Sequence, residues 1–154
     1  MDKVIILKGA SNKGKTPTLH LLIDLLISQG ATIIYQQNYS SNINTDCFVI
    51  LDVPNLGLTG IITYGDAGCE QGVQDSLQKC LQLDCIAVVG ASHVRYYKSP
   101  TTVYKILWDF GARHNAKTIE TSNIIKADGW GAPINETHLN TICAENLINI
   151  LYKL

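Results

Sequence analysis

The strongest constraint on the fold is the segment GASNKGKT at residues 9–16. It follows the apolar, β-branched run VIIL and precedes TLHLLIDLLIS, in which apolar residues recur at helical spacing. Pro17 falls in the first turn of this expected helix, where the missing N–H of proline costs little. The opening of the chain is therefore expected to read strand, glycine loop, helix.

The same segment has the composition of a phosphate-binding loop. It matches G-x-x-x-x-G-K-[ST] at every position, and it lies in the strand-to-helix context that this pattern requires. Glycines let successive backbone N–H groups face an anion, and the helix N-terminus adds the positive end of its dipole. We expect Lys15 to reach the β- and γ-phosphates and the Thr16 hydroxyl to ligate Mg²⁺. The expected phosphate-binding residues are Gly9, Ala10, Ser11, Asn12, Lys13, Gly14, Lys15, Thr16 and Pro17.

Short β-branched runs alternate with segments of helical spacing along the rest of the chain. Strands are expected at residues 3–7, 31–35, 47–53, 59–65, 85–90 and 116–120, and helices at 16–29, 70–83, 100–112 and 136–154. Ser99 and Pro100 are expected to open the third helix as its N-cap and first residue. The alternation predicts a three-layer α/β fold, a mostly parallel sheet of five to six strands with helices on both faces. At 154 residues, the chain (1–154) is expected to be one domain.

Residues 9–16 are the Walker A signature, so the chain resembles the P-loop NTPase superfamily. The stretches GIITYGDAG and LDCIAVVGAS further resemble those of small single-domain bacterial P-loop ATP-binding proteins. The resemblance implies a Rossmann-like P-loop fold that binds Mg·ATP or Mg·GTP. A GTPase would need an N-K-x-D motif after a strand, and the corresponding region reads AKTIETSN, so ATP is the expected nucleotide.

The length of one link predicts which strand breaks the parallel pattern. Only residues 54–58 separate the third and fourth expected strands, too few for a crossover helix, so these strands are expected to be antiparallel. If the second strand runs parallel to the first, the third points the opposite way and the fourth points back. Asp66 then emerges at the same end of the sheet as the glycine loop, and Asp52 at the far end.

P-loop proteins usually place an Asp beside the loop, after an apolar strand, where it orients the metal. Asp52 ends the run FVILD and is the better match to this local pattern. Asp66 ends IITYGD, and the predicted topology puts it at the correct edge. We favour Asp66, because the hairpin argument is geometric, and we keep Asp52 as the alternative metal ligand. An Asp beside a Gly is also typical of ordinary turns.

A basic loop, ASHVRYYKS, follows the expected strand at residues 85–90. Arg95, one of only two arginines in the chain, would stabilise the charge that develops in phosphoryl transfer if this loop covered the γ-phosphate. An ordinary solvated loop accounts for the same residues. Under the first interpretation, the expected catalytic residues are Lys15, Asp66 and Arg95.

The composition limits which classes of partner and which cellular location are expected. The 12 basic and 13 acidic residues give no overall basic field, so neither nucleic acid nor a membrane surface is an expected partner. The five cysteines show no CxxC spacing, and we expect them to be reduced and mostly buried. A signal-peptide pattern and an apolar run of about 20 residues are both lacking, which favours a cytoplasmic location.

These features together predict a Mg-dependent ATP-binding protein that hydrolyses ATP or transfers its γ-phosphoryl group to a small acceptor. A second phosphate on that acceptor would call for bidentate cations, and the segment QQNYSSNINT at residues 36–45 contains neither Arg nor Lys. This argues against a nucleoside-monophosphate acceptor, whereas a neutral acceptor is compatible with the amides and hydroxyls of the segment. The alternative is a regulatory module with little turnover, whose nucleotide-bound state controls a protein partner.

Overall fold

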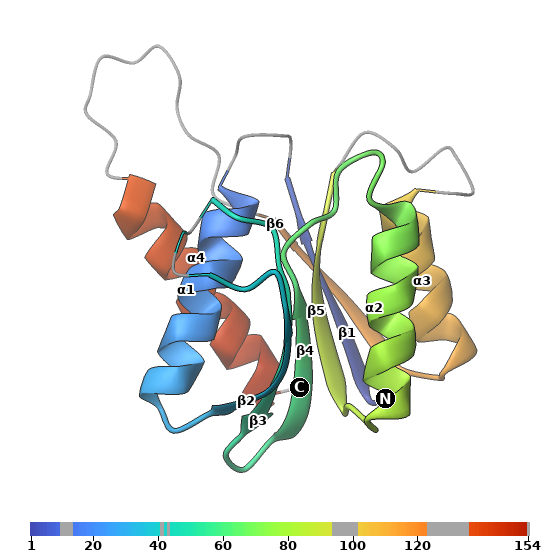
Figure 1. Ribbon diagram of the computed structural model, residues 1–154, viewed down its shortest axis with the longest axis horizontal. Coiled ribbons are helices and arrows are strands. Elements are labelled where there is room, and N and C mark those ends of the chain that lie inside the picture. Colours follow the sequence, from blue (N-terminus) through green and yellow to red (C-terminus); the bar gives the residue numbers. More distant parts are fainter. Residues whose placement is uncertain (10–13, 41, 43, 94–101, 123–135, 154) are drawn as a thin grey trace.

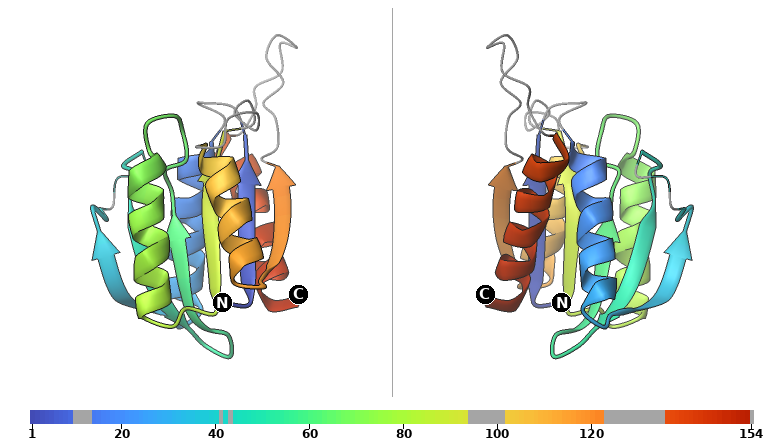
Figure 2. Two further views of the ribbon diagram at one scale, coloured as in Figure 1. Left: turned by 90° about the vertical axis from the view of Figure 1, so that its right-hand side faces the viewer. Right: turned by 90° about the vertical axis from the view of Figure 1, so that its left-hand side faces the viewer.

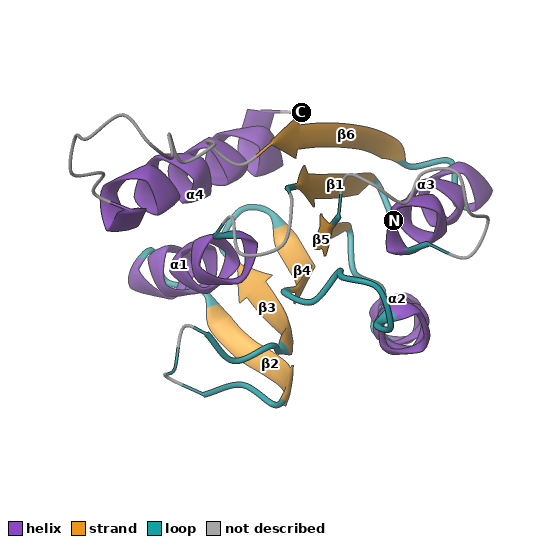
Figure 3. Cartoon of the chain, turned by 90° about the horizontal axis from the view of Figure 1, so that it is seen from above, coloured by secondary structure: helices purple, strands orange, loops and turns teal. Residues whose placement is uncertain are grey.

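The computed structural model describes residues 1–9, 14–40, 42, 44–93, 102–122 and 136–153 of the chain. Within these residues, four helices cover the two faces of a six-stranded sheet, which gives three layers (Figures 1 and 3). The predicted α/β fold class is therefore confirmed. The elements in chain order are β1 (Lys3–Lys8), α1 (Lys15–Ser28), β2 (Thr32–Gln37), β3 (Phe48–Val53), β4 (Gly57–Ile62), α2 (Glu70–Gln82), β5 (Ala87–Ser92), α3 (Val103–Arg113), β6 (Lys117–Ser122) and α4 (Glu136–Lys153).

The sheet has the strand order β2-β3-β4-β5-β1-β6. Strand β1 pairs in parallel with β5 and β6, and β4 pairs in parallel with β5. Strand β3 is antiparallel to both of its neighbours, as the short link predicted. The link is a tight turn in which the Leu56 N–H donates to the Val53 carbonyl at 3.0 Å. Asn55 and Gly57 have φ values of 62° and 111°, a conformation that short polar residues and glycine adopt most readily.

Each face of the sheet has its own apolar core and its own pair of helices (Figure 2). Helix α1 lies beside α4 and packs against both α4 and the sheet, so several of its apolar residues are fully buried: Leu19, Leu22, Ile23 and Leu26. On the other face, α2 and α3 pack against strands β1, β4 and β5. Helix α3 begins at Val103 and not at residue 100, and the predicted cap pair Ser99 and Pro100 lies outside the described residues. Thr102 is its N-cap, because the Thr102 hydroxyl accepts a hydrogen bond from the Lys105 N–H at 3.2 Å.

The five cysteines are free thiols, four of them buried and Cys69 half-buried, as predicted. In the described part of the chain, no helix combines the length and the apolar character needed to span a bilayer.

A polar cluster joins α3 to the ends of β1 and β6. Glu120 forms an ion pair with Lys8 at 2.7 Å and accepts a hydrogen bond from the Trp108 indole at 2.7 Å and another from the Tyr104 hydroxyl. Burial raises the pKa of Glu120, but the hydrogen bonds from Lys8, Tyr104 and Trp108 outweigh it and leave the pKa below its ordinary value. The ionised carboxylate therefore stabilises the fold.

This cluster makes stability depend on pH. Because the folded pKa of Glu120 is lowered, its contribution is present above the unfolded pKa of about 4.3 and is lost as pH falls through the folded pKa. We expect Glu120→Gln to lower the free energy of unfolding by about 1–2 kcal/mol at pH 7, and by less at pH 3. Urea denaturation at both pH values measures this, with the exposed Glu145→Gln as control. A loss of the same size at both pH values would contradict the assignment.

Candidate functional site

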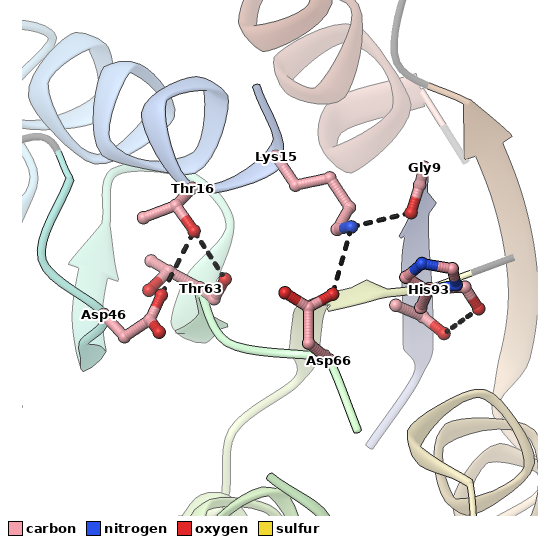
Figure 4. A network of polar contacts seen from close by, with 8 residues as sticks. Gly9, Lys15, Thr16, Asp46, Thr63, Asp66 and His93 are labelled. Carbon is pink, nitrogen blue, oxygen red and sulfur yellow. Dashed lines mark hydrogen bonds and ion pairs between the residues drawn. The ribbon is translucent and has the colours of Figure 1, made fainter. Parts of the chain in front are cut away.

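The candidate site lies at the edge of the sheet where the parallel strands end. Gly9, Asp66 and His93 follow β1, β4 and β5, and the start of the antiparallel strand β3 reaches the same edge (Figure 4). The Gly9 N–H donates to the Ser92 carbonyl at 3.1 Å, which continues the β1–β5 pairing up to the loop. Elements from distant parts of the sequence therefore meet in front of α1.

The described residues of the glycine loop are its two ends, Gly9 and Gly14 followed by Lys15 and Thr16. Predicted contacts of Ala10, Ser11, Asn12 and Lys13 lie outside the described residues. Gly14 has a φ of 82°, which favours glycine, and α1 begins directly after it with the Thr18 N–H bonded to the Gly14 carbonyl at 2.9 Å. Within the described residues, no side chain caps this helix start and its first turn has no acidic residue. Such a helix start is suited to binding an anion.

Lys15 points from α1 across the edge of the sheet. Its Nζ donates to the Gly9 carbonyl at 2.6 Å and lies 3.4 Å from Asp66 Oδ1. The Lys15 side chain is only 7% exposed, whereas that of Asp66 is 53% exposed. Burial lowers the pKa of Lys15, and the negative charge of Asp66 opposes this shift in part. Asp66 thus lies at the loop edge, where the predicted topology put it, and its carboxylate contacts Lys15.

Gly65 determines where Asp66 leaves the sheet. A Cβ on Gly65 would lie 1.8 Å from the Ala91 carbonyl oxygen, so the chain passes against β5 more closely than any side chain permits. The His93 N–H donates to the Gly65 carbonyl at 3.3 Å and stabilises this close approach of Gly65 to β5. The glycine before Asp66 therefore brings the carboxylate back toward Lys15.

Thr16 contacts a residue that sequence reasoning did not single out. Its hydroxyl lies 3.1 Å from Asp46 Oδ1 and 3.3 Å from the Thr63 carbonyl, and it can donate to either. Asp46 precedes β3, and the sequence analysis assigned no role to it. The predicted reversal of that strand was the available signal, because it places the start of the third strand, and not only the end of the fourth, at the loop edge.

The backbone beside Asp46 is fixed on two sides. The Cys47 N–H donates to the Thr63 hydroxyl at 2.8 Å, and the Thr63 N–H donates to the Cys47 carbonyl at 3.0 Å. On the helix side, His20 Nε2 donates to the Thr45 carbonyl at 2.7 Å, and His20 is buried. These contacts hold the segment before β3 against α1 and β4.

The alternative metal ligand, Asp52, lies at the wrong end of the sheet. It pairs in register with Thr32 and Leu58, near the start of β2 and β4, whereas the loop edge adjoins the ends of those strands. The antiparallel direction of β3 is the physical reason, and the better local sequence match is therefore excluded as a ligand beside Thr16. Arg95, which was predicted to stabilise the charge that develops in phosphoryl transfer, lies outside the described residues.

The oxygen atoms at this edge fit a magnesium ion. Thr16 supplies a hydroxyl, and Asp46 and Asp66 supply carboxylates that are exposed and therefore accessible. Mg²⁺ prefers such hard oxygen ligands and keeps several waters, with nucleotide phosphates completing its shell. A dense cluster of three or more His, Cys, Asp or Glu side chains is not required for this type of site, and the described residues contain none.

Comparison of the chain with protein-family models, with curated proteins and with solved structures gives no match in any of the three.

Proposed function

We propose that this protein binds Mg·ATP at the loop between β1 and α1. The observation that carries the proposal is the placement of Lys15. Its buried ammonium group lies at an uncapped helix start, between the Gly9 carbonyl and Asp66, and follows a glycine with positive φ. An intact phosphate-loop pattern in the sequence predicts this combination.

Each described residue has a chemical task in the proposed complex. The phosphate oxygens bind the Lys15 ammonium in place of its bonds to Gly9 and Asp66, and a charge-assisted bond to phosphate is stronger than one to a neutral carbonyl. The backbone N–H groups at the start of α1 face the same phosphates. The Thr16 hydroxyl, assisted by a carboxylate at this edge, would hold magnesium, and the ion would neutralise phosphate charge.

We further propose that the bound nucleotide is hydrolysed or that its γ-phosphoryl group passes to a small neutral acceptor in the cytoplasm. The polar segment between β2 and β3, residues 38–47, borders the loop edge and contains neither Lys nor Arg. The same segment favours a second candidate, in which the bound nucleotide regulates a protein partner and turnover is slow.

Two measurements on one sample distinguish these functions. Titration calorimetry with Mg·ATP tests binding, and a single-turnover assay with γ-labelled ATP tests release or transfer of phosphate. Binding with turnover supports the enzyme, and binding without turnover supports the regulatory module. Absence of binding to wild-type protein would refute both.

A further inference from the structure

We propose that Asp46, rather than Asp66, is the carboxylate that positions the metal-binding hydroxyl of Thr16, and that Asp66 acts on Lys15 instead. This inference rests on the proposed function, because it divides the work of two carboxylates within the same site. It differs from the expectation that Asp66, or alternatively Asp52, faces the metal.

The two carboxylates contact different groups. Thr16 Oγ1 lies 3.1 Å from Asp46 Oδ1, while Asp66 Oδ1 lies 3.4 Å from Lys15 Nζ. Within the described residues, the hydrogen bonds of the Thr16 hydroxyl go to Asp46 and to the Thr63 carbonyl, and Asp66 is not among its partners. Figure 4 shows the two carboxylates on separate sides of the loop edge, each directed at its own partner.

The chemistry of a hydroxyl explains why Asp46 matters. A threonine hydroxyl has one proton to donate and two lone pairs to offer, and a metal ion binds a lone pair. The proton must then point away from the metal toward an acceptor. Asp46 supplies a charged acceptor and Thr63 a neutral carbonyl, and a hydrogen bond to a charged acceptor is roughly twice as strong. Asp46 is thus a positioning residue that orients Thr16 toward the ion.

The position of Asp46 depends on the fold and not on its own side chain. The exposed carboxylate is next to Cys47, which is fully buried; its carbonyl accepts from the Thr63 N–H, and its N–H donates to the Thr63 hydroxyl. Removal of the carboxylate is therefore expected to leave the backbone in place. Asp46→Ala and Asp46→Asn are suitable variants for this reason, and thermal melting checks that both are folded.

The test measures binding and not activity. Affinity for a non-hydrolysable ATP analogue is determined by calorimetry in EDTA and again in Mg²⁺, and the ratio of the two dissociation constants gives the gain due to the metal. Asp46→Ala is expected to reduce this gain by about tenfold or more, with affinity in EDTA no weaker than that of wild type. Asp46→Asn keeps an oxygen acceptor without the charge and is expected to give an intermediate gain.

Two further variants complete the design. Asp66→Ala is expected to keep the metal gain and to bind no more weakly in EDTA, because it removes the competitor of phosphate for Lys15. Asp52→Ala removes an Asp from the opposite end of the sheet and is expected to match wild type in both conditions.

The outcomes separate the inference from the proposed function. A wild-type metal gain in Asp46→Ala, or loss of the gain in Asp66→Ala alone, would overturn the division of roles while nucleotide binding stands. Equal affinity of wild type for the ATP analogue with and without Mg²⁺ would also overturn the division of roles. A wild-type protein that binds no nucleotide in either condition would remove the proposed function and this inference together.

Discussion

Replacing Lys15 with alanine is expected to weaken nucleotide binding by about 100-fold, roughly 3 kcal/mol, because the buried ammonium group that we propose binds the phosphates is lost. The side chain is 7% exposed and makes its described contacts at the loop edge, so the effect falls on the site. Calorimetric titration with Mg·ATP measures the change. If the wild-type protein turns over ATP, the turnover of Lys15→Ala is expected to fall by at least the same factor as the affinity.

A matched lysine provides the control for this variant. Lys105 pairs with Asp109 at 2.6 Å on the surface of α3, and both side chains are 47% exposed. Lys105→Ala removes the same charge and is expected to leave nucleotide affinity unchanged, with a stability loss below about 1 kcal/mol. Equal affinities of wild type and Lys15→Ala would refute the phosphate role of the loop.

Gly65→Ala is expected to lower both stability and nucleotide affinity. The new Cβ would lie 1.8 Å from the Ala91 carbonyl oxygen, and this backbone oxygen belongs to the central strand β5 and has little freedom to move. We expect a loss of about 3 kcal/mol in the free energy of unfolding, at the upper end of what overpacking causes. Because Asp66 follows directly, its displacement from Lys15 also disturbs the site. Urea denaturation and calorimetry measure the two effects.

The variant Gly72→Ala tests whether the stability loss of Gly65→Ala is due to the close approach of Gly65 to β5 or would follow from any added methyl group. It lies in α2, where a Cβ would meet Tyr64 Cε2 at 3.3 Å, a side-chain atom that can shift slightly. Gly72→Ala also gains helix propensity, so its stability is expected to stay within about 1 kcal/mol of wild type. If Gly65→Ala were as stable as Gly72→Ala, the proposed constraint at β5 would be wrong.

Much of the fold could be predicted because its main signals are local. Alternating runs located the strands and helices, and the five-residue link identified β3 as the antiparallel strand. The start of α3 was predicted too early, because Ser99 and Pro100 form a helix-start pattern and Thr102, three residues later, can also cap. A choice between neighbouring caps depends on how the helix packs, and a local pattern does not contain that information.

The site could be predicted in part for the same reason. Lys15 follows from its motif, and Asp66 follows from the motif combined with topology. Asp46 lacks a local pattern, since its relation to Thr16 arises only when the start of β3 is brought beside the start of α1. Asp52 shows the converse case, in which a good local pattern lies at the far end of the sheet.

The most direct test of the central claim is a crystal structure with a non-hydrolysable ATP analogue and Mg²⁺. The proposed function predicts phosphate oxygens within hydrogen-bond distance of Lys15 Nζ, which would have left the Gly9 carbonyl, and a metal ion bound to the Thr16 hydroxyl. A structure in which Lys15 keeps its bonds to Gly9 and Asp66, with the triphosphate elsewhere or absent, would contradict it.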